Sequence, residues 1–277
     1  MHGFQSWPSG KAAAPLLGLI LSAWITACSG PAVIPSTDRA QNPDTPGPST
    51  ADATQAPAGT PEPTQPTYTG SGPWQVTFDT ADNTTLSGTL YGDGKVALVL
   101  APTYPGGQDG WSAFAKAAVE KGYRALSFDF EGYAASKGSP GPANAPADIA
   151  AAVTFLKSHG AEKIILAGAG LGGSAAILAA DQDSSIQGVA LISATRGVEG
   201  LQISDDDLTA LKVPSLWLAA RNDLTQNVEE MSAKAGSDKK NVWIYEGSSL
   251  HGTYIFDGAD GPDLQRRLLE FVAAVTG

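Results

Sequence analysis

Cysteine, histidine and basic residues are all scarce in this chain. A single cysteine among 277 residues excludes a disulfide within the chain, so packing of the core must hold the fold. Only three histidines are present, which leaves few side chains that could serve as a base near neutral pH. Lysine and arginine total 17 against 28 aspartates and glutamates, a formal net charge of −11. This negative charge argues against a nucleic-acid partner.

A long membrane-spanning run is also missing near the N-terminus. Residues 1–27 place Lys11 before an apolar stretch that is too short and too interrupted to be a robust bilayer span. This order is typical of a secretory signal peptide. The stretch ends in Ile-Thr-Ala-Cys, which resembles the bacterial lipobox and implies that Cys28 is lipidated and anchored to the cell membrane. An ordinary signal peptide cleaved nearby, with Cys28 as a bystander, is the alternative.

Residues 28–73 contain almost no large apolar side chains and are rich in proline and threonine. Such a composition cannot bury a core, so it predicts a disordered, partly polyproline-like segment. Behind a lipidated Cys28, this segment would be a tether that holds an extracytoplasmic domain away from the membrane. A low-complexity tail without a role would have the same composition.

Residues 74–277 are predicted to form one α/β domain. Alternating apolar and polar residues flank the stretch 80–85, which predicts an N-terminal antiparallel hairpin. Continuous apolar runs then alternate with helical patterns, as in a mostly parallel sheet with helices on both faces. The predicted strands are 95–101, 124–130, 163–168, 188–194, 214–220 and 241–247; the helical patterns run through 111–119, 146–160 and 262–275.

The stretch Gly-Ala-Gly-Leu-Gly-Gly, residues 168–173, fits two templates. Its glycines spell G-x-G-x-x-G, a dinucleotide fingerprint, for which Arg196 could bind a phosphate. It also fits the strand–turn–helix elbow of a serine hydrolase, with Gly170 in place of the serine. A dinucleotide fingerprint usually follows the first strand of its unit, whereas this turn follows a central strand. The elbow is therefore favoured, and an NAD(P)-binding oxidoreductase is the minor alternative.

Two residues after later strands meet the further demands of the elbow template. Asp223 follows the strand 214–220 and His251 follows the last strand, in the order nucleophile, acid, base. Both lie at carboxyl ends of strands, where open α/β sheets build their sites. His2 belongs to the predicted signal peptide, and His159 lies at a helix end, where it interacts favourably with the helix dipole. His251 is thus the candidate base; a loop histidine with structural bonds is the alternative.

The order of these motifs, from Lys95 to the C-terminus, resembles the α/β-hydrolase superfamily. It looks most like the compact dienelactone-hydrolase-like or small bacterial esterase members. The matching stretches are LVLAPTYPGGQDGWSAFAKAAVEKGYRALSFDFEGYAASKG, ILAGAGLGGSAAILAA, VPSLWLAARND and GSSLHG. Members hydrolyse esters, thioesters or amides through Ser, His and Asp, so the resemblance implies a hydrolase without a cofactor.

The resemblance also assigns roles to residues. It implies that His251 is the base, that Asp223 orients it, and that the backbone N–H groups of Leu171 and Tyr104 form the oxyanion hole. Two departures stand against it. The family often has His-Gly after its first central strand, where this chain has Pro-Thr at 102–103, and its nucleophile position is here Gly170.

Glycine at the elbow removes the hydroxyl that would form the acyl-enzyme. Since glycine adopts the strained elbow conformation more readily than serine, the fold should not suffer. We therefore expect a monomeric pseudo-hydrolase that binds a small ester-like or acyl ligand, or a protein partner. The alternative is an active ester hydrolase that uses water activated by His251, or a relocated nucleophile at Ser174, Ser193 or Ser136.

Two further features concern the segments around this site. The segment 195–213 is too short for the helical lid of many lipases, so no lid domain and an open pocket are expected. Three adjacent aspartates occur at 205–207 within it. Because adjacent carboxylates diverge, they favour a solvated helix start over a metal site, and no metal motif is found elsewhere.

Overall fold

The computed structural model describes residues 66–104, 107–223 and 225–277. The predicted signal peptide, Cys28 and most of the predicted tether lie outside the described residues, so the predicted domain limits stay predictions. No helix within the described ranges is both long and apolar enough to cross a membrane. Tyr68, near the start of the described chain, packs its ring against the rings of Trp74 and His159.

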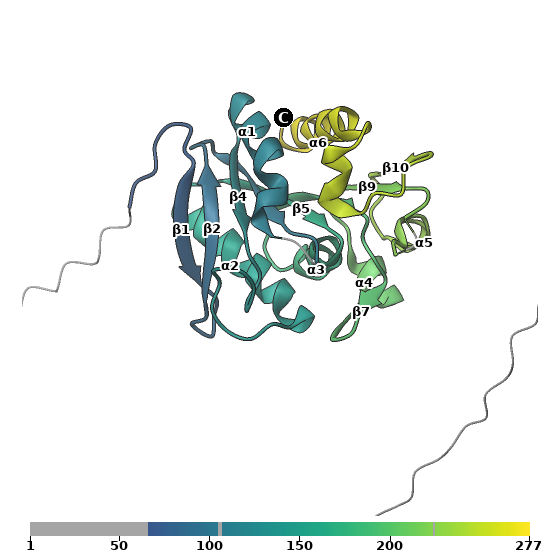
Figure 1. The fold of residues 1–277 in the computed structure, drawn as a ribbon, viewed down its shortest axis with the longest axis horizontal. Helices are drawn as coiled ribbons and strands as arrows, with labels where there is room; N and C mark the ends of the chain where they lie inside the picture. Colours follow the sequence, from purple (N-terminus) through teal and green to yellow (C-terminus); the bar gives the residue numbers. More distant parts are fainter. Residues whose placement is uncertain (1–65, 105–106, 224) are drawn as a thin grey trace, which may run out of the picture. The chain divides into compact units, whose positions relative to one another are not determined.

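One eight-stranded sheet forms the centre of the domain, in the order β1-β2-β4-β3-β5-β6-β9-β10 (Figure 1). β1 (Trp74–Asp79) and β2 (Thr85–Tyr91) form the predicted antiparallel hairpin, and β2 also runs antiparallel to β4. All later neighbours are parallel, which confirms the predicted fold class. These strands are β3 (Val96–Ala101), β4 (Arg124–Phe128), β5 (Lys163–Ala169), β6 (Ile186–Ile192), β9 (Ser215–Ala220) and β10 (Lys240–Tyr245).

Helices cover both faces of the sheet, as Figure 1 shows. Leu98 and Leu100 of β3 pack in one cluster with the buried residues of α1 and α6, whereas Ala97 and Val99 pack in another with those of α2 to α5. This alternation follows from the pleat, which points successive side chains to opposite faces. The helices are α1 (Ser112–Glu120), α2 (Ala145–Ser158), α3 (Leu171–Ala179), α4 (Asp205–Ala210), α5 (Val228–Lys234) and α6 (Gly261–Thr276), with the short 3₁₀ helices η1 (Gln108–Trp111), η2 (Pro142–Asn144) and η3 (Gly252–Asp257).

Strand β10 differs from the expectation that every strand is covered on both faces. It lies at the edge of the sheet, and Val242 and Trp243 are each 42% exposed. Strands β4 and β10 each end two residues earlier than predicted. Because β10 ends early, His251 lies on a longer loop than the sequence indicated. An apolar run marks a strand but does not show how much of it is covered or where pairing stops.

The connection from β6 to β9 contains no helical lid. It forms a two-stranded hairpin, β7 (Gly197–Val198) and β8 (Leu201–Gln202), followed by α4. Ser204 caps α4 by accepting from the backbone N–H of Asp207, whose carboxylate accepts in return from Ser204. The aspartates 205–207 therefore begin a helix, as predicted. Within the described ranges, no group of three His, Cys, Asp or Glu residues is placed to hold a metal ion.

The carboxylate of Asp148, in α2, is buried in the domain. Its Oδ2 accepts from the backbone N–H of Glu131 at 2.8 Å, whereas Oδ1 has no hydrogen-bond partner among the described residues. Burial raises the pKa of Asp148 to about 6, from an ordinary value of 3.8, in spite of that hydrogen bond. The folded protein therefore holds this proton at a pH where the unfolded chain has lost it.

We predict that Asp148 makes the folded state less stable as the pH rises from about 4 to about 6. Between these values the folded state binds more protons than the unfolded state, so stability falls by up to about 1.4 kcal/mol per pH unit. Asp148→Asn removes this titration. Urea unfolding at several pH values should show the wild type losing stability relative to the variant across this range. If the difference in the free energy of unfolding between the wild type and Asp148→Asn did not change with pH, the prediction would be contradicted.

Candidate active site

The elbow predicted from the sequence is present between β5 and α3. Gly170 is the single residue between them, with φ 51° and ψ −116°. This is the left-handed region, which glycine enters without the strain that a side chain would cause. The N–H of Gly170 donates to the carbonyl of Ile192 at the end of β6, so the turn is tied to the neighbouring strand.

The glycines on either side of Gly170 permit close backbone packing. A Cβ on Gly168 would lie 2.2 Å from the carbonyl oxygen of Gly172, and a Cβ on Gly172 would lie 2.5 Å from that of Ala101. The N–H of Gly172 also donates to the carbonyl of Pro102 at 3.2 Å. The first turn of α3 therefore packs directly on β5 and on the loop after β3. This packing accounts for the glycine spacing without a bound phosphate.

Asp223 and His251 form a hydrogen-bonded pair. The Nδ1 of His251 lies 2.8 Å from Oδ2 of Asp223, and Thr225 donates its hydroxyl to Oδ1 at 2.7 Å and its N–H at 3.1 Å. The Thr225 hydroxyl also lies 3.0 Å from Nδ1 of His251. The Asp223 side chain is 3% exposed and that of His251 is 28% exposed. The acid is thus held below the surface, and the imidazole reaches toward solvent.

The surroundings of Asp223 favour its charged form. Burial by itself would raise the pKa, but hydrogen bonds from His251 and Thr225 outweigh burial and hold the pKa of Asp223 below its ordinary value. A carboxylate accepts the Nδ1 proton of a neutral imidazole, which leaves the lone pair on Nε2 free to take a proton. That atom faces the elbow, because an ideal Cβ on Gly170 would lie 2.6 Å from it.

Asp223, His251 and the two predicted oxyanion donors line one cavity. As the first residue of α3, Leu171 has a backbone N–H without a partner inside the helix. Tyr104 lies two residues after Pro102, whose carbonyl accepts from the N–H of Gly172. The cavity has a volume of about 720 Å³ and is lined by Tyr104, Leu171, Thr195, Gly197, Val198, Asp223, Thr225, Ser249, His251 and Tyr254.

Several of these wall residues were not predicted from the sequence. Gly197 and Val198 come from the β7–β8 hairpin, so the segment expected to leave the pocket open instead supplies part of its wall. Two-residue strands leave almost no periodic signal in a sequence. Tyr254 lies three residues after His251 on η3, lines the cavity, and is 49% exposed. An aromatic residue three positions after the predicted base was the available signal in the sequence.

The three serines considered as relocated nucleophiles bond to the backbone and do not line the described cavity. Ser174 donates to the carbonyl of Thr195 at 2.8 Å. Ser136 donates to a carbonyl in the loop after β4 at 2.6 Å, and Ser193 accepts from the N–H of Gly252 at 3.0 Å. All three are buried, and their hydroxyls hold neighbouring loops in place.

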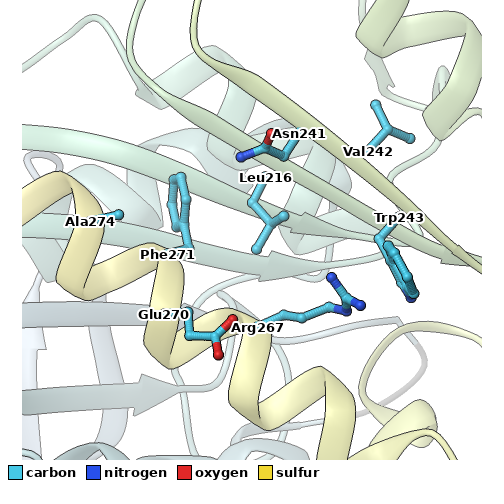
Figure 2. Close-up of a pocket in the computed structure, with 8 residues that line it drawn as sticks. All are labelled: Leu216, Asn241, Val242, Trp243, Arg267, Glu270, Phe271 and Ala274. Carbon is cyan, nitrogen blue, oxygen red and sulfur yellow. The ribbon is translucent and has the colours of Figure 1, made fainter.

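A second hollow lies at the free edge of the sheet, between β10 and α6 (Figure 2). It measures about 340 Å³, and the guanidinium of Arg267 lies 3.2 Å from the ring centre of Trp243. No predicted site residue lines it, and its walls contain no histidine or hydroxyl nucleophile.

Arg196, the phosphate ligand of the dinucleotide interpretation, forms ion pairs with Asp205 and Glu230 and is therefore already neutralised.

Comparisons with known proteins agree with this fold. Residues 96–249 match the family model described as alpha/beta hydrolase fold. The esterase Pf2001 of Pyrococcus furiosus superposes with a TM-score of 0.64 at 18% identity, covering 77% of this chain and 100% of that one. A thermophilic esterase of Thermogutta terrifontis gives 0.60 at 15% identity, covering 74% and 100%. The esterase of Exiguobacterium antarcticum gives 0.59 at 14%, covering 72% and 100%. No curated protein matches the chain.

We predict that Gly170→Ala destabilises the domain more than Gly160→Ala does. Both glycines have positive φ, but an added Cβ meets no atom within 4 Å at Gly160, whereas at Gly170 it meets His251 and Thr103 at 2.6 Å. The second variant therefore measures backbone strain alone, and the first adds overpacking of about 1–3 kcal/mol. Urea unfolding followed by circular dichroism gives both free energies. Equal losses would contradict the prediction.

Proposed function

Because the chain belongs to the α/β-hydrolase fold family, we propose that it is a pseudo-hydrolase, which binds a small ester-like or acyl ligand without forming an acyl-enzyme. The observation that carries this proposal is the state of the nucleophile position. Gly170 provides no hydroxyl, and the space for a side chain there is bounded at 2.6 Å by His251 Nε2 and Thr103 Oγ1. A covalent intermediate at the elbow needs both the hydroxyl and that space.

The walls of the pocket favour an uncharged ligand. Tyr104, Leu171, Val198 and Tyr254 present aromatic and aliphatic surface, and threonine and serine hydroxyls lie among them. The lining residues include no lysine or arginine. A carboxylate or phosphate would therefore lose water without gaining a cationic partner, which is costly. A neutral ester or amide, with its carbonyl oxygen near the N–H of Leu171, suits these walls better.

A second candidate function is slow hydrolysis by activated water. The observation that favours it is the His251–Asp223 pair, whose Nε2 faces the pocket region beside the elbow. In this reaction Nε2 takes a proton from water while the oxygen of that water attacks the ligand carbonyl. Collapse of the intermediate then breaks the bond to the leaving alcohol or amine, which takes the proton from Nε2. The N–H groups of Leu171 and Tyr104 would hold the oxyanion. General base catalysis of this kind contributes about 10²–10⁴-fold.

We also propose that the protein works outside the cytoplasm, attached to the bacterial membrane. The support is in the sequence: Cys28 follows Ile-Thr-Ala at the end of an apolar run, and residues 28–73 have the composition of a tether. A lipid on Cys28 would keep the hydrolase-type domain close to ligands at the cell surface.

Fluorophosphonate labelling of the purified full chain tests the leading proposal. We expect no covalent adduct by mass spectrometry, because no elbow hydroxyl is available to react. With p-nitrophenyl acetate, we expect the wild type to stay within about twofold of His251→Ala, since the base has no nucleophile to activate. An adduct on the wild type would contradict the pseudo-hydrolase. A larger loss in His251→Ala without an adduct would favour activated water instead.

Fractionation of cells tests the anchor. In the producing bacterium, the wild-type chain should sediment with membranes, and Cys28→Ser should move it to the soluble extracytoplasmic fraction, because acyl chains supply the membrane affinity. Ser29→Ala is the matched control and should stay with the membranes. Equal membrane association of Cys28→Ser and the wild type would contradict lipidation at this residue.

A further inference from the structure

Thr103 carries a buried hydroxyl that no other part of the site uses. The residue is 3% exposed, and its Oγ1 has no hydrogen-bond partner among the described residues. Burying a hydroxyl without a partner costs stability, so such a group in a native structure needs an explanation. The threonine side chain that carries it lies beside the elbow.

The Thr103 hydroxyl lies where a nucleophile side chain would project. An ideal Cβ on Gly170 would be 2.6 Å from Thr103 Oγ1 and 2.6 Å from His251 Nε2, so these two atoms are separated by no more than twice that distance. On its other side, the hydroxyl is 2.9 Å from an ideal Cβ on Gly252. Two glycines with positive φ thus surround this one threonine side chain.

We infer that Thr103 and Gly170 are a coupled replacement, in which the threonine side chain fills the space that a nucleophile at position 170 would need. The inference rests on the proposed pseudo-hydrolase, and it explains why the space beside Gly170 at the elbow is filled. Thr103 on the loop after β3 and Gly170 after β5 then form one packing unit. A bulkier residue on one loop compensates for a smaller residue on the other.

The coupling predicts which atoms must move when a side chain is added at position 170. Thr103 is a short side chain, the residue is 3% exposed, and its hydroxyl is buried. His251 is the more exposed neighbour, and displacing its ring would strain the 2.8 Å bond to Asp223. Gly170→Ser alone would therefore introduce a hydroxyl and at the same time displace the base that should activate it.

The same geometry argues against Thr103 as a nucleophile in its own right. Its Oγ1 is buried, and Thr103 is not among the residues that line the 720 Å³ cavity. A carbonyl carbon must come within about 3–3.5 Å of an attacking oxygen. A ligand in the described cavity does not have that access, so we assign the hydroxyl to packing.

The test compares three variants of the full chain with the wild type: Gly170→Ser, Thr103→Ala/Gly170→Ser and Thr103→Val/Gly170→Ser. Fluorophosphonate labelling and p-nitrophenyl acetate hydrolysis are measured for each. We expect the alanine double variant to react at position 170 at least tenfold faster than Gly170→Ser. The valine double variant, which keeps the volume of threonine but lacks its hydroxyl, should remain as slow as Gly170→Ser. Adding His251→Ala should abolish the gain.

Equal reactivity of Gly170→Ser and the alanine double variant would overturn the coupling, and so would a gain in the valine variant. Thermal melting keeps the inference testable if a serine variant folds poorly. Removal of Thr103 frees one side of the added Cβ, so the loss in melting temperature caused by Gly170→Ala should be at least halved in a Thr103→Ala background. Equal losses in the two backgrounds would also overturn the coupling.

Failure of the pseudo-hydrolase proposal gives a result that differs from failure of the coupling between Thr103 and Gly170. Labelling of the wild type at another residue would end the pseudo-hydrolase proposal, while the comparison among the position-170 variants would still decide the coupling. Labelling of the wild type that disappears in Thr103→Val would overturn both, because the threonine would then be a nucleophile.

Discussion

At the carboxyl end of β5 the chain turns into α3 within one residue, and the backbones around that turn approach so closely that side chains are excluded. Gly168 and Gly172 allow α3 to pack on β5 and on the loop after β3. Gly170 takes the left-handed conformation between them. This close approach fixes the start of α3, and therefore the position of the Leu171 N–H and of the adjacent loop residue Tyr104. The pocket is built around these positions.

The positions of Asp223 and His251 do not depend on the glycine turn. Asp223 and His251 follow β9 and β10, respectively. Parallel pairing of β5, β6, β9 and β10 brings the carboxyl ends of these strands to the same end of the sheet. Thr225 holds the carboxylate from its own loop. None of these contacts involves a side chain at position 170. The geometry of the pair therefore does not depend on a side chain at position 170, so an ordered pair by itself is weak evidence of turnover.

Burial and element length decided which parts of the structure could be predicted from the sequence. The interior strands were predicted closely because burial on both faces makes them continuously apolar, whereas β10 was expected to be covered and lies exposed at the edge. The proximity of Asp223 and His251 could be predicted because loops after parallel strands converge regardless of their own sequence. Val198 was missed because the hairpin that carries it is too short for a periodic pattern, and its place in the wall depends on distant packing.

The sequence by itself determined the fold class, the position of the elbow and the absence of a hydroxyl at Gly170, since these depend on local pattern and residue identity. Only the tertiary structure showed that the Thr103 side chain lies beside Gly170. Thr103 is 67 positions from Gly170 along the chain, and no periodicity links the two. Their proximity results from parallel pairing of β3 with β5, which places Ala101 beside Gly168 and so brings the residues that follow each strand together.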